Sequence, residues 1–197
     1  PALVYKDFTT SDQVIRDLFT SDINRLIVDS KPLYKRILNY INDVDPNLSK
    51  KLELKKGKGS IFDEYNIEEQ YEKSLKRKIW MKSGAHLVIE HTEAMVVIDV
   101  NSGRFIGKKD QEQNSLKINL ESAREVARQL RLRDIGGLIV IDFIDLQKEQ
   151  NQRKVFDELR IALKNDRAKV SLTEFSTFGI LEMTRQRIRL NILHTVS

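Results

Sequence analysis

The chain has 197 residues, of which 40% are hydrophobic and 32% are charged, so its composition supports a hydrophobic core and excludes intrinsic disorder. It has no cysteine, which excludes disulfides and thiolate zinc sites and favours a reducing compartment. We expect no transmembrane helix, because no apolar run approaches the roughly 18 residues required, and no secretory signal. The net charge of +5 suits a polyanionic partner such as nucleic acid, although ordinary variation explains it equally well.

Residues 1–78 are predicted to mix helices with short strands. In chain order, the expected elements are a helix over 11–19, a strand over 25–29, a helix between Ser30 and Pro46, a strand over 51–56 and a helix over 67–77. Ser30 followed by Pro32 is typical of the start of a helix. Because this part offers only two or three short strands, we expect it to depend on the second part or on residues outside this chain.

Residues 79–197 carry a sharper pattern. The expected elements are strands over 86–91 and 94–100, a helix over 114–134, a strand over 138–144, a helix over 148–165, a strand over 169–173 and a short helix over 179–187. Only Thr92 and Glu93 separate the first two strands, and this spacing predicts a tight hairpin. Gly136 and Gly137 are expected to end the long helix. The overall prediction is therefore an α/β fold in which helices and strands are mixed.

The strands over 94–100 and 138–144, with the long helix between them, form a predicted β–α–β unit with parallel strands and a right-handed crossover. Each strand is an apolar run that ends in an aspartate, Asp99 in VVIDVNS and Asp142 in IVIDFID. The carboxyl ends of parallel strands lie at one edge of a sheet, where open α/β sheets bind ligands, so we expect the two aspartates to lie close together. Asn101 is expected on the same side of its strand as Asp99.

Two neighbouring carboxylates repel each other, and one of them should have a raised pKa unless a cation lies between them. Oxygen ligands from aspartate and asparagine suit a hard cation such as Mg²⁺, and such a site can activate water for attack on a phosphodiester. The alternative is a local structural role, since an aspartate after a strand often starts a turn or caps the next helix. We expect this structural role for Asp145, ahead of the helix over 148–165.

Five cations close to these aspartates in the sequence can contact phosphates: Arg104, Lys108, Lys109, Arg131 and Arg133. The two lysines can equally belong to a solvated loop, and the last two arginines lie at a predicted helix C-terminus, where the helix dipole favours cations. Trp80 and Phe105 can stack on bases, although core packing is the favoured prediction for Trp80. The three histidines, His86, His91 and His194, lack the spacing of a ligand set.

Four long stretches of this sequence resemble the ribonuclease E/G family in order and spacing. They are SGAHLVIEHTEAMVVIDVNSGRF, NLESAREVARQLRLRDIGGLIVIDFIDL, NDRAKV and FGILEMTRQR, which together cover nearly all of residues 83–188. Upstream, the words RDLF, RLIVDS and IFDEYNIEEQ resemble the same family more loosely.

This resemblance implies that residues 1–78 are the later part of a ribonuclease-H-like subdomain and that residues 79–197 are a deoxyribonuclease-I-like catalytic subdomain. It implies a Mg²⁺ ion on Asp99 and Asp142, with Asn101 assisting by hydrogen bonding near the scissile phosphate. The implied reaction is endonucleolytic hydrolysis of single-stranded RNA to 5′-phosphate and 3′-hydroxyl ends. The implied roles are RNA processing and messenger decay in the bacterial cytoplasm.

Some parts of the family pattern are not matched in this sequence. They are the oligonucleotide-binding barrel, the 5′-end sensor and the paired cysteines that link subunits through zinc, so we expect no zinc link here. Because the sequence starts at Pro1 and not at methionine, we expect a piece of a longer enzyme or a processed chain. Three hypotheses stay open: a metal-dependent endoribonuclease core, a module that binds RNA and forms a homodimer or higher homo-oligomer without cutting, and a phosphoesterase acting on another substrate.

Overall fold

The computed structural model describes most of the chain in two compact units. The described residues are Ile15, Phe19, 23–57, 59–103, 111–164 and 166–187. The units are Pro1–Glu68 and Glu69–Ser197, whereas the sequence placed the boundary after residue 78. Both units contain helices and strands, which confirms the predicted mixed α/β class. The helix predicted over 11–19 lies mostly outside the described residues.

Over residues 23–57 and 59–68, the first unit contains a two-stranded parallel sheet and short and long helical segments. Its elements are β1 (Leu26–Val28), α2 (Lys31–Val44), the 3₁₀ helix η1 (Pro46–Lys51), β2 (Leu52–Leu54) and α3 (Ile61–Glu64). The predicted cap at Ser30 is confirmed, because its hydroxyl accepts a hydrogen bond from the Leu33 N–H at 3.4 Å. Ile37 and Ile41 of α2 are buried against Val28 and Leu52 of the strands and form a small core.

The second unit is built on a six-stranded sheet. Its elements are α4 (Ile67–Leu75), which starts just before the boundary, β3 (Lys78–Trp80), β4 (His86–His91), β5 (Met95–Asn101), α5 (Gln111–Leu132), β6 (Gly137–Asp142), α6 (Glu149–Leu163), β7 (Val170–Leu172) and β8 (Ile180–Arg185). The strand order is β3-β4-β5-β6-β8-β7. Only the central pair, β5 and β6, is parallel, and α5 connects these two strands as the predicted β–α–β unit requires.

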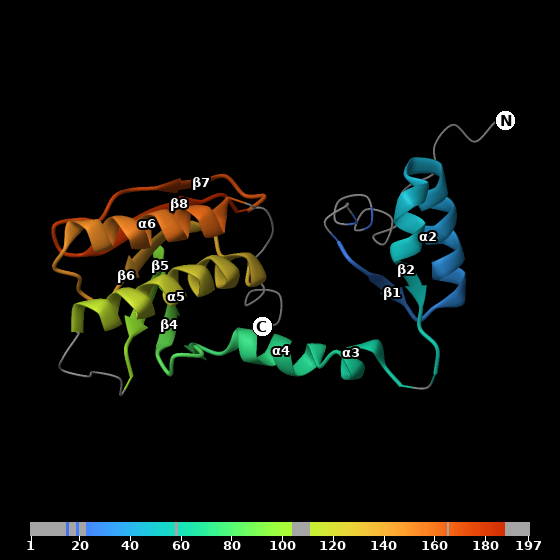
Figure 1. The fold of residues 1–197 in the computed structure, drawn as a ribbon, viewed down its shortest axis with the longest axis horizontal. Helices are drawn as coiled ribbons and strands as arrows, with labels where there is room; N and C mark the ends of the chain where they lie inside the picture. Colours follow the sequence, from blue (N-terminus) through green and yellow to red (C-terminus); the bar gives the residue numbers. More distant parts are fainter. Residues whose placement is uncertain are drawn as a thin grey trace. The chain divides into compact units, whose positions relative to one another are not determined.

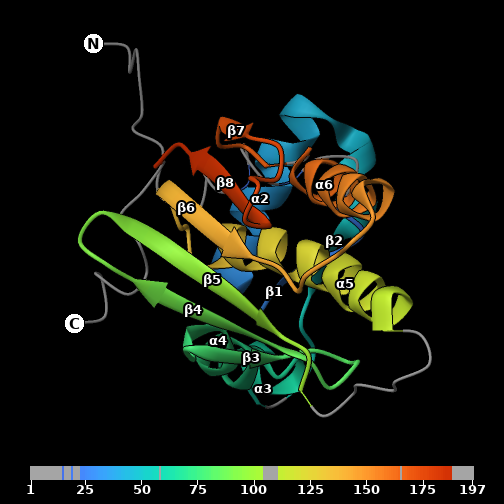
Figure 2. The ribbon, with the colours of Figure 1, turned by 90° about the vertical axis from the view of Figure 1, so that its left-hand side faces the viewer.

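Helices α5 and α6 lie side by side on one face of this sheet (Figures 1 and 2). The strand residues that point toward them are fully or almost fully buried, as Ile98, Ile139 and Leu181 show. Residues alternate along each strand, so Val97, Asp99 and Asn101 face the opposite side and are only half-buried. We call this opposite side the carboxylate face; its residues near the strand ends are Trp80, His86, Asp99, Asn101, Asp142 and Ile180.

The hairpin between β4 and β5 is confirmed, with a connection of three residues. The Thr92 N–H donates to the Met95 carbonyl at 2.9 Å, and the Thr92 hydroxyl accepts from the Met95 N–H at 3.1 Å. The threonine side chain therefore closes a turn that has none of the residue pairs favoured in two-residue hairpins.

The short helix predicted over 179–187 is wrong, because this segment is strand β8. Leu181, Met183 and Arg185 are buried while Glu182 and Thr184 are exposed, which is the period of two of a strand. Leucine, glutamate and methionine favour helices, but pairing between β6 and β7 overrides that local preference.

Asp145 does not cap helix α6, which was one of the two local roles expected for it. Helix α6 has Lys148 as its N-cap and no capping side chain of its own. Instead, Glu112 in the first turn of α5 accepts hydrogen bonds from the N–H groups of Gln147 and Lys148, at 3.0 and 3.2 Å, and from Asn151 at 2.6 Å. These hydrogen bonds lower the pKa of Glu112, and the bond from the Gln147 N–H has the largest effect.

Candidate active site at the carboxyl edge of the sheet

Asp99 and Asp142 are register partners on neighbouring parallel strands. Adjacent strands lie about 4.8 Å apart, so the two backbones hold the carboxylates side by side on the carboxylate face. Both residues belong to the last positions of their strands, at the carboxyl edge of the sheet. The predicted juxtaposition is therefore present in the structure, and it arises from the β–α–β connection through α5.

Asn101 lies two residues beyond Asp99 on the same side of β5. Its side-chain Nδ2 donates a hydrogen bond to Asp99 Oδ2 at 2.6 Å. This contact fixes the orientation of the Asp99 carboxylate and leaves Oδ1 as the oxygen without that bond. In this structure Asn101 is thus a residue that positions Asp99.

Burial raises the pKa of Asp142, and the negative charges of Asp99 and Asp145 raise it further. The predicted like-charge repulsion is therefore present at this edge. A cation held between Asp99 and Asp142 would relieve it.

We expect Asp142→Asn to raise the thermal unfolding midpoint of the metal-free chain at neutral pH by about 1–3 °C. Because the folded-state pKa of Asp142 is raised, wild type loses stability as pH rises through that pKa, and the variant does not. The gain should vanish near about pH 3, below the pKa of an unfolded aspartate. Melting curves in EDTA at both pH values measure this difference.

Asp157→Asn provides the control, since Asp157 pairs with Arg160 at 2.9 Å and its loss should not raise the midpoint. Equal midpoints for wild type and Asp142→Asn at neutral pH would contradict the repulsion.

The segment that follows Asp142 is held by a buried asparagine of α5. Asn119 has no exposed surface, and its Nδ2 donates to the Ile144 carbonyl at 2.7 Å while its Oδ1 accepts from the Ile144 N–H at 3.1 Å. The amide thus replaces a missing strand partner for Ile144. It ties the chain just beyond Asp142 to the helix that follows Asp99.

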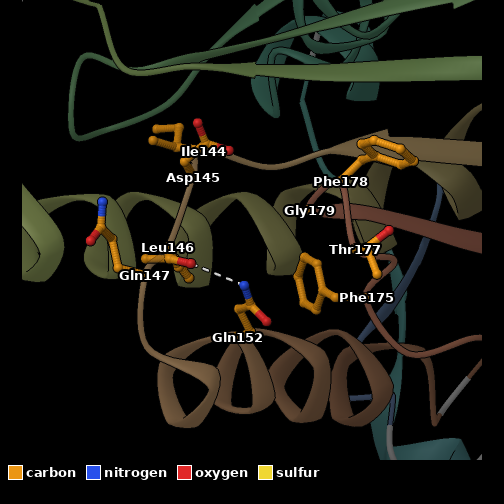
Figure 3. A pocket seen from close by; sticks show the side chains of 9 residues that line it. All are labelled: Ile144, Asp145, Leu146, Gln147, Gln152, Phe175, Thr177, Phe178 and Gly179. Carbon is orange, nitrogen blue, oxygen red and sulfur yellow. Dashed lines mark hydrogen bonds between the residues drawn. The ribbon is translucent and has the colours of Figure 1, made fainter.

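A pocket of about 400 Å³ opens next to this segment (Figure 3). Ile144–Gln147 form one side, Phe175–Gly179 form the other, and Gln152 of α6 donates to the Leu146 carbonyl at 3.0 Å. Asp145 points its carboxylate toward this region, with Oδ1 3.6 Å from the position of a Cβ atom on Gly179. Asp145 is therefore part of the pocket wall and not the helix cap that the sequence predicted.

The described structure does not place the predicted phosphate-binding cations next to the two aspartates. Arg104, Lys108 and Lys109 lie outside the described residues. Helix α5 has 22 residues and runs about 33 Å back along the sheet, so Arg131 and Arg133 lie toward the opposite edge. Their expected closeness to the aspartates is wrong, because residues near in sequence are carried away by the crossover helix.

Arg133 is also too buried to contact RNA. It is 1% exposed, its Nε donates to Gln129 at 2.9 Å, and its Nη2 donates to the Lys76 carbonyl at 2.6 Å. Burial lowers its pKa. Arg131 is exposed, but its Nη1 donates to the Ala162 carbonyl at 2.9 Å, at the end of α6. Both arginines therefore have structural contacts at the helix C-termini.

The core packing predicted for Trp80 is wrong, since its side chain is 63% exposed on strand β3. Strand β3 was not predicted from the sequence. The signal was present in the alternating KIW of 78–80 and in the turn that follows, where Gly84 has φ of 83° and the Met81 N–H donates to the Ala85 carbonyl. Trp80 lies 4.8 Å from the ring of His86, with the two planes tilted by 48°.

Asp99 and Asp142 are the two carboxylates that strand register pairs at this edge. Across the described ranges there is no group of three or more histidine, aspartate or glutamate side chains that could enclose a metal ion. Mg²⁺ commonly takes only one or two carboxylates and completes its shell with waters and substrate phosphate. The paired carboxylate oxygens of Asp99 and Asp142 fit that donor set.

These features define an α/β protein with a paired-carboxylate site at the edge of its sheet. Residues 1–188 match the model of the Ribonuclease E/G family. The match extends over most of the chain, and the chain belongs to that family, as its sequence motifs indicated.

Individual relatives support the same assignment. Ribonuclease G of Escherichia coli (strain K12) is 38% identical over 193 residues, which are 98% of this chain and 40% of the relative. The chloroplastic Ribonuclease E/G-like protein of Arabidopsis thaliana is 40% identical over 199 residues, covering all of this chain and 20% of the relative. Ribonuclease E of Haemophilus influenzae is 40% identical over 188 residues, which are 95% of this chain and 20% of the relative. The chain therefore spans less than half the length of these relatives.

Membrane insertion through a helix has no support in the part of the chain that the structure describes. None of the helices there combines the length and the apolar character that a membrane span requires.

Proposed function

We propose that this chain is the catalytic part of an endoribonuclease that hydrolyses single-stranded RNA with the help of Mg²⁺. The observation that carries the proposal is the register pairing of Asp99 with Asp142 at the carboxyl edge of the sheet. Membership of the Ribonuclease E/G family supplies the class of reaction, and several relatives carry the name ribonuclease.

The residues of this chain have separate roles in the proposed reaction. Asp99 and Asp142 would hold the cation through their carboxylate oxygens, and Asn101 would keep Asp99 oriented through its hydrogen bond of 2.6 Å. When bound, Mg²⁺ would stabilise the charge that develops on the phosphate and lower the pKa of the attacking water. The amide of Asn101 also has a second N–H, which can donate to a phosphate oxygen. The proposed products are 5′-phosphate and 3′-hydroxyl ends.

The wider setting of this activity is part of the same proposal. We infer RNA processing and decay as the role and the bacterial cytoplasm as the location, on the strength of bacterial relatives and a sequence without cysteine. A homodimer or higher homo-oligomer is the assembly that we propose.

A cleavage assay tests the proposal directly. The purified chain is incubated with a fluorescent, A/U-rich single-stranded RNA in Mg²⁺, in EDTA, and in Mg²⁺ after annealing the RNA to its complement. We expect cleavage only for the single strand in Mg²⁺, with product 5′ ends that are substrates for a phosphatase and 3′ ends that accept ligation.

The alternative is that this chain binds RNA without cutting it. RNA binding with Mg²⁺ uptake but no cleavage would favour this alternative over the enzyme. Cleavage that persists in EDTA would contradict the role of the carboxylates as metal ligands, while ends with a 2′,3′-cyclic phosphate would contradict attack by water.

A further inference from the structure

Three side chains, two on the edge strand β3 and one on its neighbour β4, form an aromatic and cationic surface on the carboxylate face. Trp80 is 63% exposed, its ring lies 4.8 Å from the ring of His86, and the Lys78 Nζ lies 4.3 Å from the centre of the Trp80 ring. We call these three residues the Trp80 platform. A tryptophan held by a second ring and a cation, with most of its surface in solvent, is arranged to bind another flat group.

Strand register places the platform next to the paired carboxylates. Trp80 is the partner of His86, and His86 is the partner of Asn101 on β5. All three are at the carboxyl edge and on one face of the sheet. Two strand spacings separate Trp80 from Asn101, or about 10 Å between backbones. This is comparable to one or two nucleotides of an extended single strand, so a base on Trp80 leaves a neighbouring phosphate within reach of Asp99.

A groove beside β3 adds positive charge. It has a volume of about 810 Å³ and is lined by residues of α4, β3 and α5, Trp80 among them. Its cations are Lys73, Lys76, Lys78, Lys82, Arg124 and Arg128. The acidic residues of its described lining are Glu121 and Glu125.

The pairing of these cations favours a polyanion as the occupant of the groove. Arg124 and Arg128 are engaged by glutamates at 2.8 and 3.0 Å. Among the described residues, no carboxylate pairs with Lys76, Lys78 or Lys82, which all belong to or flank β3. Lys76 and Lys78 precede Trp80 along the chain and Lys82 follows it, so the three lysines provide charge for successive phosphates.

We propose that the Trp80 platform stacks a nucleobase of single-stranded RNA beside the paired carboxylates, with the phosphates on one side of that base following the lysines of β3. The proposal rests on the proposed function, because it assigns a substrate position in the same site. Stacking on an aromatic ring needs an unstacked base and does not depend on base identity. The platform therefore selects single strands over duplexes and tolerates many sequences.

The sole tryptophan of the chain makes this inference measurable without any cleavage. Wild-type chain in EDTA is titrated with a single-stranded oligoadenylate and, separately, with the same strand annealed to oligouridylate, while tryptophan fluorescence and RNA anisotropy are recorded. We expect saturable quenching by the single strand that follows the same binding curve as the anisotropy. The duplex is expected to quench little.

Matched variants separate stacking from other effects. Trp80→Ala is expected to weaken single-strand binding about tenfold, and Trp80→Phe is expected to keep it within about threefold of wild type. Phe62→Ala, which removes an exposed aromatic side chain of the first unit, is expected to leave binding unchanged. Circular dichroism of each variant confirms that it is folded.

Several results would overturn the proposal: RNA binding without quenching, equal affinity for Trp80→Ala, equal quenching by the duplex, or quenching that grows with protein concentration alone, which would point to a second copy of the chain. The outcome is independent of catalysis. Quenching without cleavage would support the platform and contradict the proposed hydrolysis, whereas cleavage with equal affinity of Trp80→Ala would do the reverse.

Discussion

Replacing either Asp99 or Asp142 with asparagine is expected to lower the rate of RNA cleavage by about 1,000-fold or more. Each change removes one of two paired carboxylates, and the remaining one holds a divalent cation poorly. The double variant is expected to be no slower than either single variant, because the first substitution already disables the site. Single-turnover cleavage with Mg²⁺ measures the rates, and RNA anisotropy should show affinities within about threefold of wild type.

The control is Asp145→Asn, which removes a carboxylate from the pocket wall three residues beyond Asp142. Asp145 is not a register partner of Asp99. The RNA cleavage rate of Asp145→Asn is therefore expected to fall less than about tenfold below that of wild type. If Asp145→Asn is as slow as the other two variants, three carboxylates share the cation and the two-ligand assignment is wrong. Calorimetric titration with Mg²⁺ gives the same test without RNA: wild type binds, and Asp99→Asn binds far more weakly.

Arg185→Met is expected to lower the free energy of unfolding by about 3–5 kcal/mol. Arg185 is 4% exposed, and its Nε and Nη2 donate to Asp166 at 3.0 and 3.1 Å. Its Nη1 donates to Asp134 and to the Ile135 carbonyl, both at 2.9 Å. Burial acts to raise the pKa of Asp166, but the bonds from Arg185 lower it overall. Without the guanidinium, an ionised carboxylate that is 2% exposed loses its ion-pair partner.

Urea unfolding at neutral pH measures this loss, and two further variants assign its cause. Arg160→Met, at an exposed pair, is expected to lose less than about 1 kcal/mol. Adding Asp166→Asn to Arg185→Met should recover part of the stability, since it removes the stranded charge. A loss below about 1 kcal/mol for Arg185→Met would show that the buried pair contributes little to the fold.

The elements predicted well from sequence are those whose pattern is long or chemically marked. The helix capped by Ser30, the hairpin of β4 and β5, and the β–α–β unit all follow from local residues. The segment that became β8 was missed because its leucine, glutamate and methionine favour a helix, and only its place between β6 and β7 makes it a strand. Strand β3 has only three residues, so its alternation was too short to identify a strand without the turn that follows it.

The candidate site shows the same division. Asp99, Asn101 and Asp142 could be predicted because parallel strands bring their ends to one edge, whatever the details of packing. The positions of the cations could not be predicted, because the 22-residue crossover helix carries residues that follow Asp99 in the sequence away from it. Arg133, for example, is buried near the opposite edge. The exposed position of Trp80 could not be predicted either. Only the register of β3 with β4 shows that this apolar residue faces solvent beside the carboxylates.

The position of Asp99 before α5 and of Asp142 after it ties the candidate site to the order of folding. The two carboxylates are distant along the unfolded chain, and they meet only when the loop containing α5 has closed and β6 has paired with β5. A cation that needs both aspartates therefore binds the native chain and not the unfolded one, and it stabilises the native state by mass action. The repulsion between the carboxylates arises when β6 pairs with β5, so cation binding favours that pairing.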